Sequence, residues 1–578
     1  MAYRVVAGRL LFLSTLIALH ACGASRVPPV PPDSPFYGSS LPPHDAAMRH
    51  YLTLRDSSAL DQLLASGPRD ELIKRLNAGL FLHRLGRYTE SNVALQRAEA
   101  LAEERYTKSI GQNVAAFLVS DNVLDFYPSA LEWSMIHYYG MMNYLALDDV
   151  ENALVEARKA NALLRRYAND NPGRSFTNPA ALQYIAGMLQ WSAGEDNDAM
   201  VSLRQSLTGY DDYEQRYGVA PPRPVAEDVA RVASVLGFDD VAEETRKTYL
   251  SDGESSVAEP AEVSADMGEL MVVIENGFVA HKAEEKLYVP VLASEKDAVL
   301  NGNVGSAVLA AVRVLIRTVV VMNYLSQEGI DYPRHEDGVV IAAAGSAVGL
   351  ELISLAWPSY QLAARRASDI RVSVNDERSI APTIIQDLSA IAVRDFEESK
   401  PTIMLRMVSR GLLKEAAVTA AEAAGEDRGG ALGGFLGRVT ARAVATATER
   451  ADTRSWSTLP AELLLARFQL PTGSHVLRIS YDGLNHRREL IELEIEIEAG
   501  RVTTHTVSLL GDDEGNGERI RIARTGVHYE APKAPETQRR TPPRRRRYDT
   551  ASAPPQTVPH RTATTPDGTT PLRHPARR

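Results

Sequence analysis

A single thiol is the residue with the clearest chemistry in this chain. Cys22 is the only cysteine among 578 residues, and it follows the apolar run 10–19 and the small residue Ala21. Arg4 and Arg9 precede the run, which gives the order of a secretory signal. A lone thiol at this place is best explained as an acceptor for a lipid, because no second cysteine is present for a disulfide. A permanent transmembrane anchor is the weaker alternative, since the run is too short to span a bilayer as a stable helix.

The sequence around this thiol also resembles a known processing signal. Residues 19–22, Leu-His-Ala-Cys, resemble the lipobox of bacterial lipoproteins, in which the cysteine is diacylated and becomes the new N-terminus. His20 departs from the usual small or aliphatic residue, and Gly23 stands where Asp would imply retention at the inner membrane. Acyl chains such as palmitate bury methylene groups at about 0.8 kcal/mol each. The resemblance therefore implies a lipid anchor in the outer membrane, with the body facing the periplasm.

The other reactive residues form no catalytic or metal-binding motif. The sequence has no P-loop, no His-Glu-x-x-His and no Gly-x-Ser-x-Gly pattern. Its 13 histidines are scattered without a paired metal-ligand spacing. We therefore predict no catalytic residue, no metal site, no cofactor and no enzymatic activity. A peptidoglycan-active or other envelope enzyme with an unrecognised site is the alternative.

The net charge of −11 is unevenly divided. From residue 530 to the end, eleven Lys or Arg outweigh four Asp or Glu, a net of +7, so the remainder carries −18. An acidic body argues against nucleic-acid binding by the folded part. The basic end is rich in Pro, Thr and Arg and is predicted to be a disordered tail. It could contact anionic wall polymers or lipid head groups, or only keep the protein soluble.

Helical periodicity dominates the first half of the chain. Two segments share one spacing of small and apolar residues, and a looser third copy lies between them. The copies are Gly79, Gly86, Tyr88, Ser91, Leu95 and Ala98; Gly187, Gly194, Ala199, Leu203 and Ser206; and 143–149 with Ala153, Ala157 and Ala160. They resemble tetratricopeptide repeats, in which small residues let paired helices approach closely. The resemblance implies a concave surface for a partner, and packing against the rest of this chain is the alternative.

The second half mixes helix and strand signals. An apolar run ends at Asn276-Gly277, which predicts a hairpin turn with 286–291 as the return strand. Two Gly- and Ala-rich apolar stretches, 304–322 and 339–357, contain charged residues, so we expect buried or amphipathic helices rather than membrane insertion. From residue 463 the pattern alternates with period two, which predicts a small antiparallel module with one buried and one acidic face.

A basic stripe is predicted on the helix over 391–413. Arg406, Arg410 and Lys414 recur every four residues and therefore share one helix face. Such a face is usually solvated, but it could also pair with an acidic partner or a phosphate-bearing surface.

These signals predict a multidomain, mainly α fold. A mature chain of about 550 residues is too long for one core. We expect a tetratricopeptide-like array, an α+β region, a small β module and a disordered tail. The predicted segments are a signal peptide (1–21), the lipidated cysteine with a Pro- and Ser-rich spacer (22–45), the helical domain (46–250), an acidic linker (251–267), the α+β region (268–462), the β module (463–524) and the tail (525–578).

Several short motifs resemble an uncharacterised family of bacterial lipoproteins that join tetratricopeptide-like helices to a distinctive C-terminal half. The matching stretches are 272–277 (VVIENG), 357–360 (WPSY), 388–392 (LSAIA), 406–414 (RMVSRGLLK) and, most distinctive, 452–460 (DTRSWSTLP). The resemblance covers about residues 50–510 and omits the basic tail. It implies no enzymatic activity, and it implies neighbours among other small outer-membrane lipoproteins, including ones resembling the curli secretion channel and activators of peptidoglycan synthases.

The last of these motifs is expected to be structural. Asp452 and Arg454 could form an ion pair or a helix cap, with Trp456 buried and Pro460 ending the turn. No nucleophile or base accompanies them, which argues against catalysis. The leading hypothesis is a non-catalytic envelope lipoprotein that acts as an adaptor or assembly component. Besides an envelope enzyme, a component of a membrane-inserting or secretion-channel complex is the alternative.

Overall fold

A computed structural model shows a mainly helical chain with several small sheets, which confirms the predicted fold class. Cys22, the spacer, residues 251–265 of the linker and nearly all of the tail lie outside the described residues. The description covers residues 70–109, 125–171, 179–217, 220–250, 266–300, 306, 309–318, 350–362, 367–375, 377, 379–447, 450–483, 488–499, 501–509 and 529–530.

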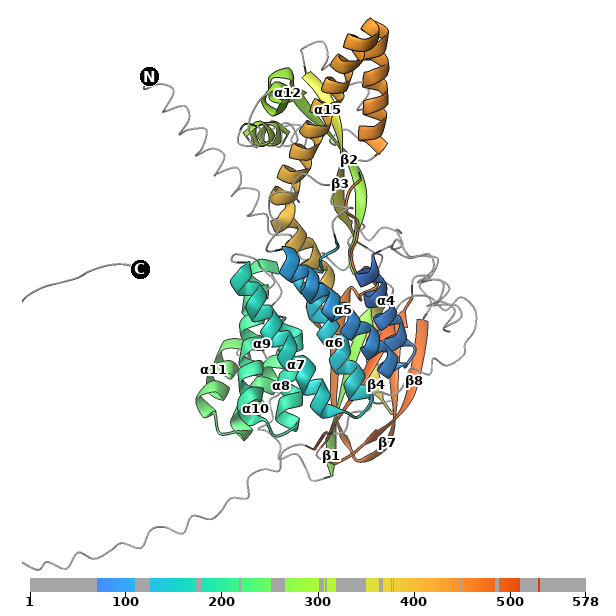
Figure 1. The fold of residues 1–578 in the computed structure, drawn as a ribbon. Helices are drawn as coiled ribbons and strands as arrows, with labels where there is room; N and C mark the ends of the chain where they lie inside the picture. Colours follow the sequence, from blue (N-terminus) through green and yellow to red (C-terminus); the bar gives the residue numbers. More distant parts are fainter. Residues whose placement is uncertain are drawn as a thin grey trace, which may run out of the picture. The chain divides into compact units, whose positions relative to one another are not determined.

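Eight helices of the first half form four consecutive hairpins (Figure 1). The pairs are α4 (Glu71–Arg84) with α5 (Tyr88–Ser109), α6 (Ala130–Ala146) with α7 (Val150–Asp170), α8 (Ala180–Ser192) with α9 (Asp196–Tyr217), and α10 (Arg223–Val235) with α11 (Asp239–Tyr249). The first helix of the first three pairs is buried along most of its length, whereas the second exposes its outer side. The array therefore has an inner and an outer layer.

Each hairpin turns at one residue in the left-handed backbone region. These residues are Gly86, Asp148, Gly194 and Gly237, with φ of 72°, 58°, 77° and 79°. The backbone N–H of the following residue donates to the carbonyl five residues earlier, as Arg87 does to Leu82. This bond satisfies a carbonyl that the ending helix leaves open, as in a Schellman motif. Gly86 and Gly194, which recur in the sequence repeat, therefore mark helix ends.

The other repeated glycines mark close helix contacts. A Cβ atom on Gly79 would lie 2.5 Å from Leu95 Cδ2, and one on Gly187 would lie 2.7 Å from Leu203 Cγ. In the middle pair Gly140 holds the same place, but its neighbour is Glu156 at 3.2 Å. The shared spacing is thus a packing contact, in which glycine lets the partner helix approach.

Three sheets follow the array. Strand β1 (Met267–Asn276) lies inside a five-stranded sheet of order β10-β9-β1-β6-β5, antiparallel to β6 and parallel to β9. The other sheets are β4-β7-β8 and β2-β3. Their bounds are β2 (His281–Leu292), β3 (Leu350–Gln361), β4 (Ser368–Val374), β5 (Thr383–Asp387), β6 (Glu462–Pro471), β7 (Gly473–Asp482), β8 (Arg488–Ile497), β9 (Arg501–Leu509) and β10 (Tyr529–Glu530).

Three expectations for this half were wrong. No hairpin forms at Asn276-Gly277, because β1 pairs with β6 and β9 while β2 pairs with β3. The end of the apolar stretch 339–357 is strand β3 rather than helix. The expected boundary between residues 462 and 463 falls inside the pairing of β6 with β1, so the C-terminal strands are not a separate module. In each case pairing between distant strands overrides the local pattern.

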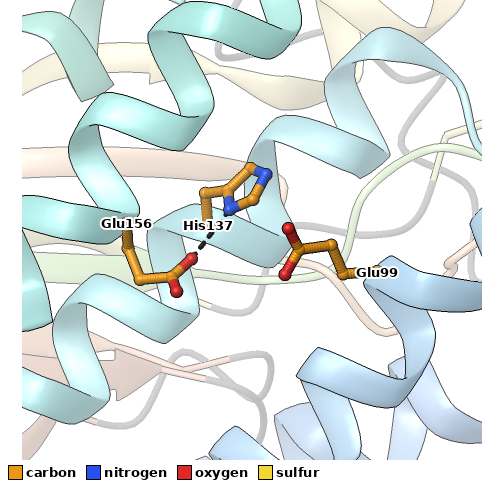
Figure 2. Close-up of side chains that lie close together, drawn as sticks. All are labelled: Glu99, His137 and Glu156. Atoms are coloured by element: carbon orange, nitrogen blue, oxygen red, sulfur yellow. Dashed lines mark hydrogen bonds and ion pairs between the residues drawn. The ribbon is translucent and has the colours of Figure 1, made fainter. Parts of the chain in front are cut away.

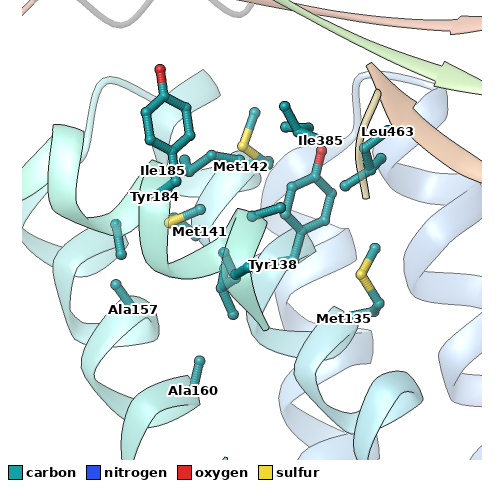
Figure 3. Close-up of a cluster of buried hydrophobic side chains, with 14 of the residues drawn as sticks. Met135, Tyr138, Met141, Met142, Ala157, Ala160, Tyr184, Ile185, Ile385 and Leu463 are labelled. Atoms are coloured by element: carbon teal, nitrogen blue, oxygen red, sulfur yellow. The ribbon is translucent and has the colours of Figure 1, made fainter. Parts of the chain in front are cut away.

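Strand β1 separates two hydrophobic cores. Met271 and Val273 belong to the core under the helices, whereas Val272 and Ile274 belong to the core shared with the β4-β7-β8 sheet. Alternate residues of a strand point to opposite faces, so β1 is buried on both sides. Figure 3 shows part of the helix-side core, where Tyr138 and the methionines of α6 meet Ile385 and Leu463 from the strands. The result is a layer of helices over two stacked sheets.

A long helix completes the described fold. Helix α15 (Leu388–Ala447) confirms the helix expected over 391–413, although it contains Pro401. It shares a third core with β2, β3 and the helical residues 309–318, and it lies against α12 (Ala293–Leu300). Among the described residues, no helix is both long and apolar enough to cross a membrane.

The tight contact in the third hairpin gives a first prediction. Gly187→Ala should lower the free energy of unfolding by about 1–3 kcal/mol, because the new methyl group overpacks against Leu203. Urea denaturation followed by circular dichroism measures the change. Leu203→Ala should cost about 2–5 kcal/mol by itself. The double variant should cost clearly less than the sum of the two, and simple additivity would contradict the contact.

Candidate functional site

The motif at 452–460 lies between the helical array and β1. Trp456 is fully buried, and its ring centroid lies 6.0 Å from that of Tyr139 on α6. Its backbone N–H donates to Glu132 Oε1 over 2.6 Å. The other oxygen of Glu132 accepts from Ser129 N and closes the capping box of α6. One carboxylate therefore both starts the helix and holds the motif.

An ion pair fixes the beginning of the motif. Arg454 Nε donates to Asp452 Oδ1 over 2.8 Å, and its guanidinium also lies 3.4 Å from Asp70. Asp70 caps the N-terminus of α4 and binds Arg105 of α5 over 2.9 Å. The expected ion pair is thus present, and it extends to the first hairpin.

The end of the motif makes two further links to α4 and one to the sheet region. Thr458 Oγ1 donates to Asn77 over 2.8 Å, and Arg84 donates to the Thr458 carbonyl over 3.1 Å. The Leu459 carbonyl accepts from Val279 N. Leu459 N–H donates to the Trp456 carbonyl, closing a turn that Pro460 follows. The motif therefore occupies the inner face of α4 and α6, where an array of this kind would offer its concave surface.

A buried ion-pair cluster also links the helical array to strand β6. Asp228 of α10 is fully buried and lies 2.6 Å from Arg467 of β6 and 2.7 Å from Arg231. The hydroxyl of Tyr184 on α8 donates to the other carboxylate oxygen of Asp228, Oδ2, over 2.5 Å. Burial alone would raise the pKa of Asp228, but the charges of Arg467 and Arg231 outweigh it and hold the pKa below its ordinary value.

The predicted basic stripe is not a solvated face. Arg410 is buried, and Arg406 and Lys414 are half-buried. The reason is that α15 buries this part of its length, including Met407 and Leu412, in the third core. The structure describes no surface stripe ready for a phosphate or an acidic partner at these residues.

The structure brings together three possible metal ligands that the sequence prediction missed. Glu99 of α5, His137 of α6 and Glu156 of α7 each offer one ligand atom, and these atoms lie within 4.8 Å of one another (Figure 2). The three residues are far apart in the chain, so no local spacing could reveal them. The available signal was the third copy of the repeat, where Glu156 stands in the place of Leu95 and Leu203.

A lysine and a histidine both bind the carboxylates of this cluster. His137 Nδ1 lies 2.8 Å from Glu156 Oε2, and Lys159 Nζ lies 3.1 Å from both Glu156 Oε1 and Glu99 Oε2. Burial opposes the charge of Glu156, but the hydrogen bond from His137 and the charge of Lys159 outweigh it and lower the pKa. Burial likewise opposes the charge of Lys159, and Glu156 outweighs it and raises the pKa. The cluster therefore holds both charges at neutral pH.

A narrow cleft borders the two carboxylates of the cluster. Its walls include Asn92, Gln96, Glu99, Gly140, Tyr144 and Glu156, and it has room for about one water molecule. The arrangement can bind a cation or a proton, since two carboxylates and one imidazole converge there. No protein-family model, no curated protein and no solved structure matches the chain.

The motif's tryptophan gives the second prediction. Trp456→Ala should lower the free energy of unfolding by about 3–5 kcal/mol, because it leaves a cavity between α6 and β1. Trp456→Phe is the matched control: the indole N–H has no hydrogen-bond partner among the described residues, so the change removes volume only. It should cost about half as much or less. Equal stability of the wild type and the alanine variant in urea denaturation would contradict a structural role.

Proposed function

We propose that this chain is a non-catalytic lipoprotein of the bacterial cell envelope, held at the periplasmic side of the outer membrane by a lipid on Cys22. The observation that carries the proposal is the position of the only cysteine, directly behind an apolar signal-like run and Ala21. A single thiol cannot form a disulfide within the chain, and its position behind this run suits a lipid acceptor. The role of the folded body is that of an adaptor or assembly component.

The 452–460 motif covers the inner face of α4 and α6. The proposal therefore places the envelope partner on the outer helices of the array. Val93 of α5, Val155 of α7 and Val201 of α9 are exposed by 45%, 36% and 53%. Val93 and Val201 hold the same place in the first and third hairpins, whereas the matching residue of the second hairpin, Leu154, is buried and Val155 beside it is exposed. The proposal places partner contact at this layer, where one exposed valine stands on each of three outer helices.

The anchor has a direct test. Cys22→Ala should abolish labelling by radioactive palmitate and move the protein from the membrane to the soluble fraction, or stop its maturation, because no other thiol can accept the lipid. Cys22→Ser is the matched control for side-chain size and should behave as the alanine variant does. A variant that stayed membrane-bound and normally processed would remove the anchor from the proposal.

The adaptor role has a separate test in intact cells. A photoreactive amino acid at Val93 or Val201 should crosslink the full chain to the same envelope protein, which mass spectrometry identifies. Leu490 is the matched control, since it is exposed by 57% but lies on strand β8 rather than on a helix of the array. If the helix positions gave no defined product beyond that at Leu490, the outer layer would not be the binding surface.

A further inference from the structure

The cluster of Glu99, His137 and Glu156 in the second hairpin carries an inference beyond anchoring. We propose that it is a binding site for a divalent transition-metal ion of the zinc class, and that Lys159 is a built-in competitor for the same place. Neither the anchor nor the adaptor role requires such a site, and its test is independent of both.

The donor atoms are suited to a metal ion. One imidazole nitrogen and two carboxylate oxygens, from three helices, lie within 4.8 Å of one another and point toward one space (Figure 2). His137 Nδ1 and Glu156 Oε2 are 2.8 Å apart. This contact is a hydrogen bond, so metal binding requires the His137 tautomer that carries its proton on Nε2 and leaves the Nδ1 lone pair free. Two donors that share a metal at about 2.0–2.2 Å lie roughly 3 Å apart, so the two atoms need little further movement.

The repeat shows that packing does not call for these residues. Leu95 and Leu203 fill the place of Glu156 in the neighbouring hairpins. Three residues before each packing glycine, Leu76 and Tyr184 stand where His137 stands. A buried carboxylate and a buried imidazole cost stability unless they are paired. His137 and Glu156 thus both depart from the residues that fill these positions in the neighbouring hairpins. Two such departures at one point suggest a functional reason.

The ammonium group of Lys159 already occupies the place between the two carboxylates. Its ammonium bridges one oxygen of Glu99 and one of Glu156, each over 3.1 Å. Its side chain is 39% exposed, so it can leave toward solvent without disturbing the core. The cleft along Gly140 and Tyr144, which Glu99 and Glu156 also line, then has room for about one water-sized ligand beside the carboxylates.

The donor set also selects among metals. Magnesium and calcium prefer all-oxygen sites, whereas imidazole with carboxylates suits zinc and its neighbours. Three protein ligands with an open fourth position are typical of zinc sites that hold a water molecule. The site therefore takes a divalent transition metal rather than an alkaline-earth ion.

The test is titration of the full-length protein in detergent micelles, after removal of metal with a chelator. Zn²⁺ should bind one to one in calorimetry, and Co²⁺ should give a visible absorption band from a nitrogen and oxygen site. His137→Gln and Glu156→Gln should each weaken binding by at least about tenfold. Glu103→Gln is the matched control, because Glu103 lies one turn along α5 and pairs with Arg166 instead. It should bind as the wild type does.

The Lys159→Met variant tests separately whether the lysine competes with the metal ion. Removal of the competing ammonium should tighten Zn²⁺ binding by about tenfold, since the free site is then fully available. Circular dichroism confirms that each variant is folded. Equal affinity of the wild type and both ligand variants would overturn the proposal. Unchanged affinity in Lys159→Met would also overturn it, because the metal would then bind somewhere other than between these carboxylates.

Discussion

The packing of the inner helices onto one face of β1 and β6, with the β4-β7-β8 sheet on the other face, is the interaction on which this fold depends. Met271 and Val273 pack against the helices, and Val272 and Ile274 pack against the second sheet. Removing either layer would expose apolar side chains of β1 to water. The partners of β1 come from beyond residue 461 and beyond residue 500. The C-terminal half must therefore be present before the helical half is covered, and the two halves behave as one structural unit.

Buried polar groups fix how the helices sit on the sheet. Asp228 pairs with Arg467, and Glu132 holds the backbone of Trp456, both across this interface. Apolar side chains alone would let the helices shift along the sheet with little loss. A buried charge or N–H group must face its partner, so it allows one position only. Losing one partner would leave the other buried and unpaired, which is costly. The motif at 452–460 thus specifies the docking as well as filling space.

This docking changes what the array can do. An open array of helical hairpins offers its inner face to a partner, but here α4 and α6 bind a segment of the same chain. The outer layer of the array stays uncovered by this motif. Two of its exposed valines, Val93 and Val201, recur with the repeat, whereas Glu156 departs from it. A lipid anchor would then present these surfaces to the periplasm.

The sequence by itself determined the local features. The helical array, and the ion pair and buried tryptophan of the 452–460 motif, follow from spacing and residue type, because they depend on neighbours close along the chain. Only the tertiary structure decided which strands pair, why Arg410 is buried, and that Glu99, His137 and Glu156 meet. Those outcomes depend on residues tens to hundreds of positions apart, and a periodic pattern shows that a face is apolar or polar without showing what covers it.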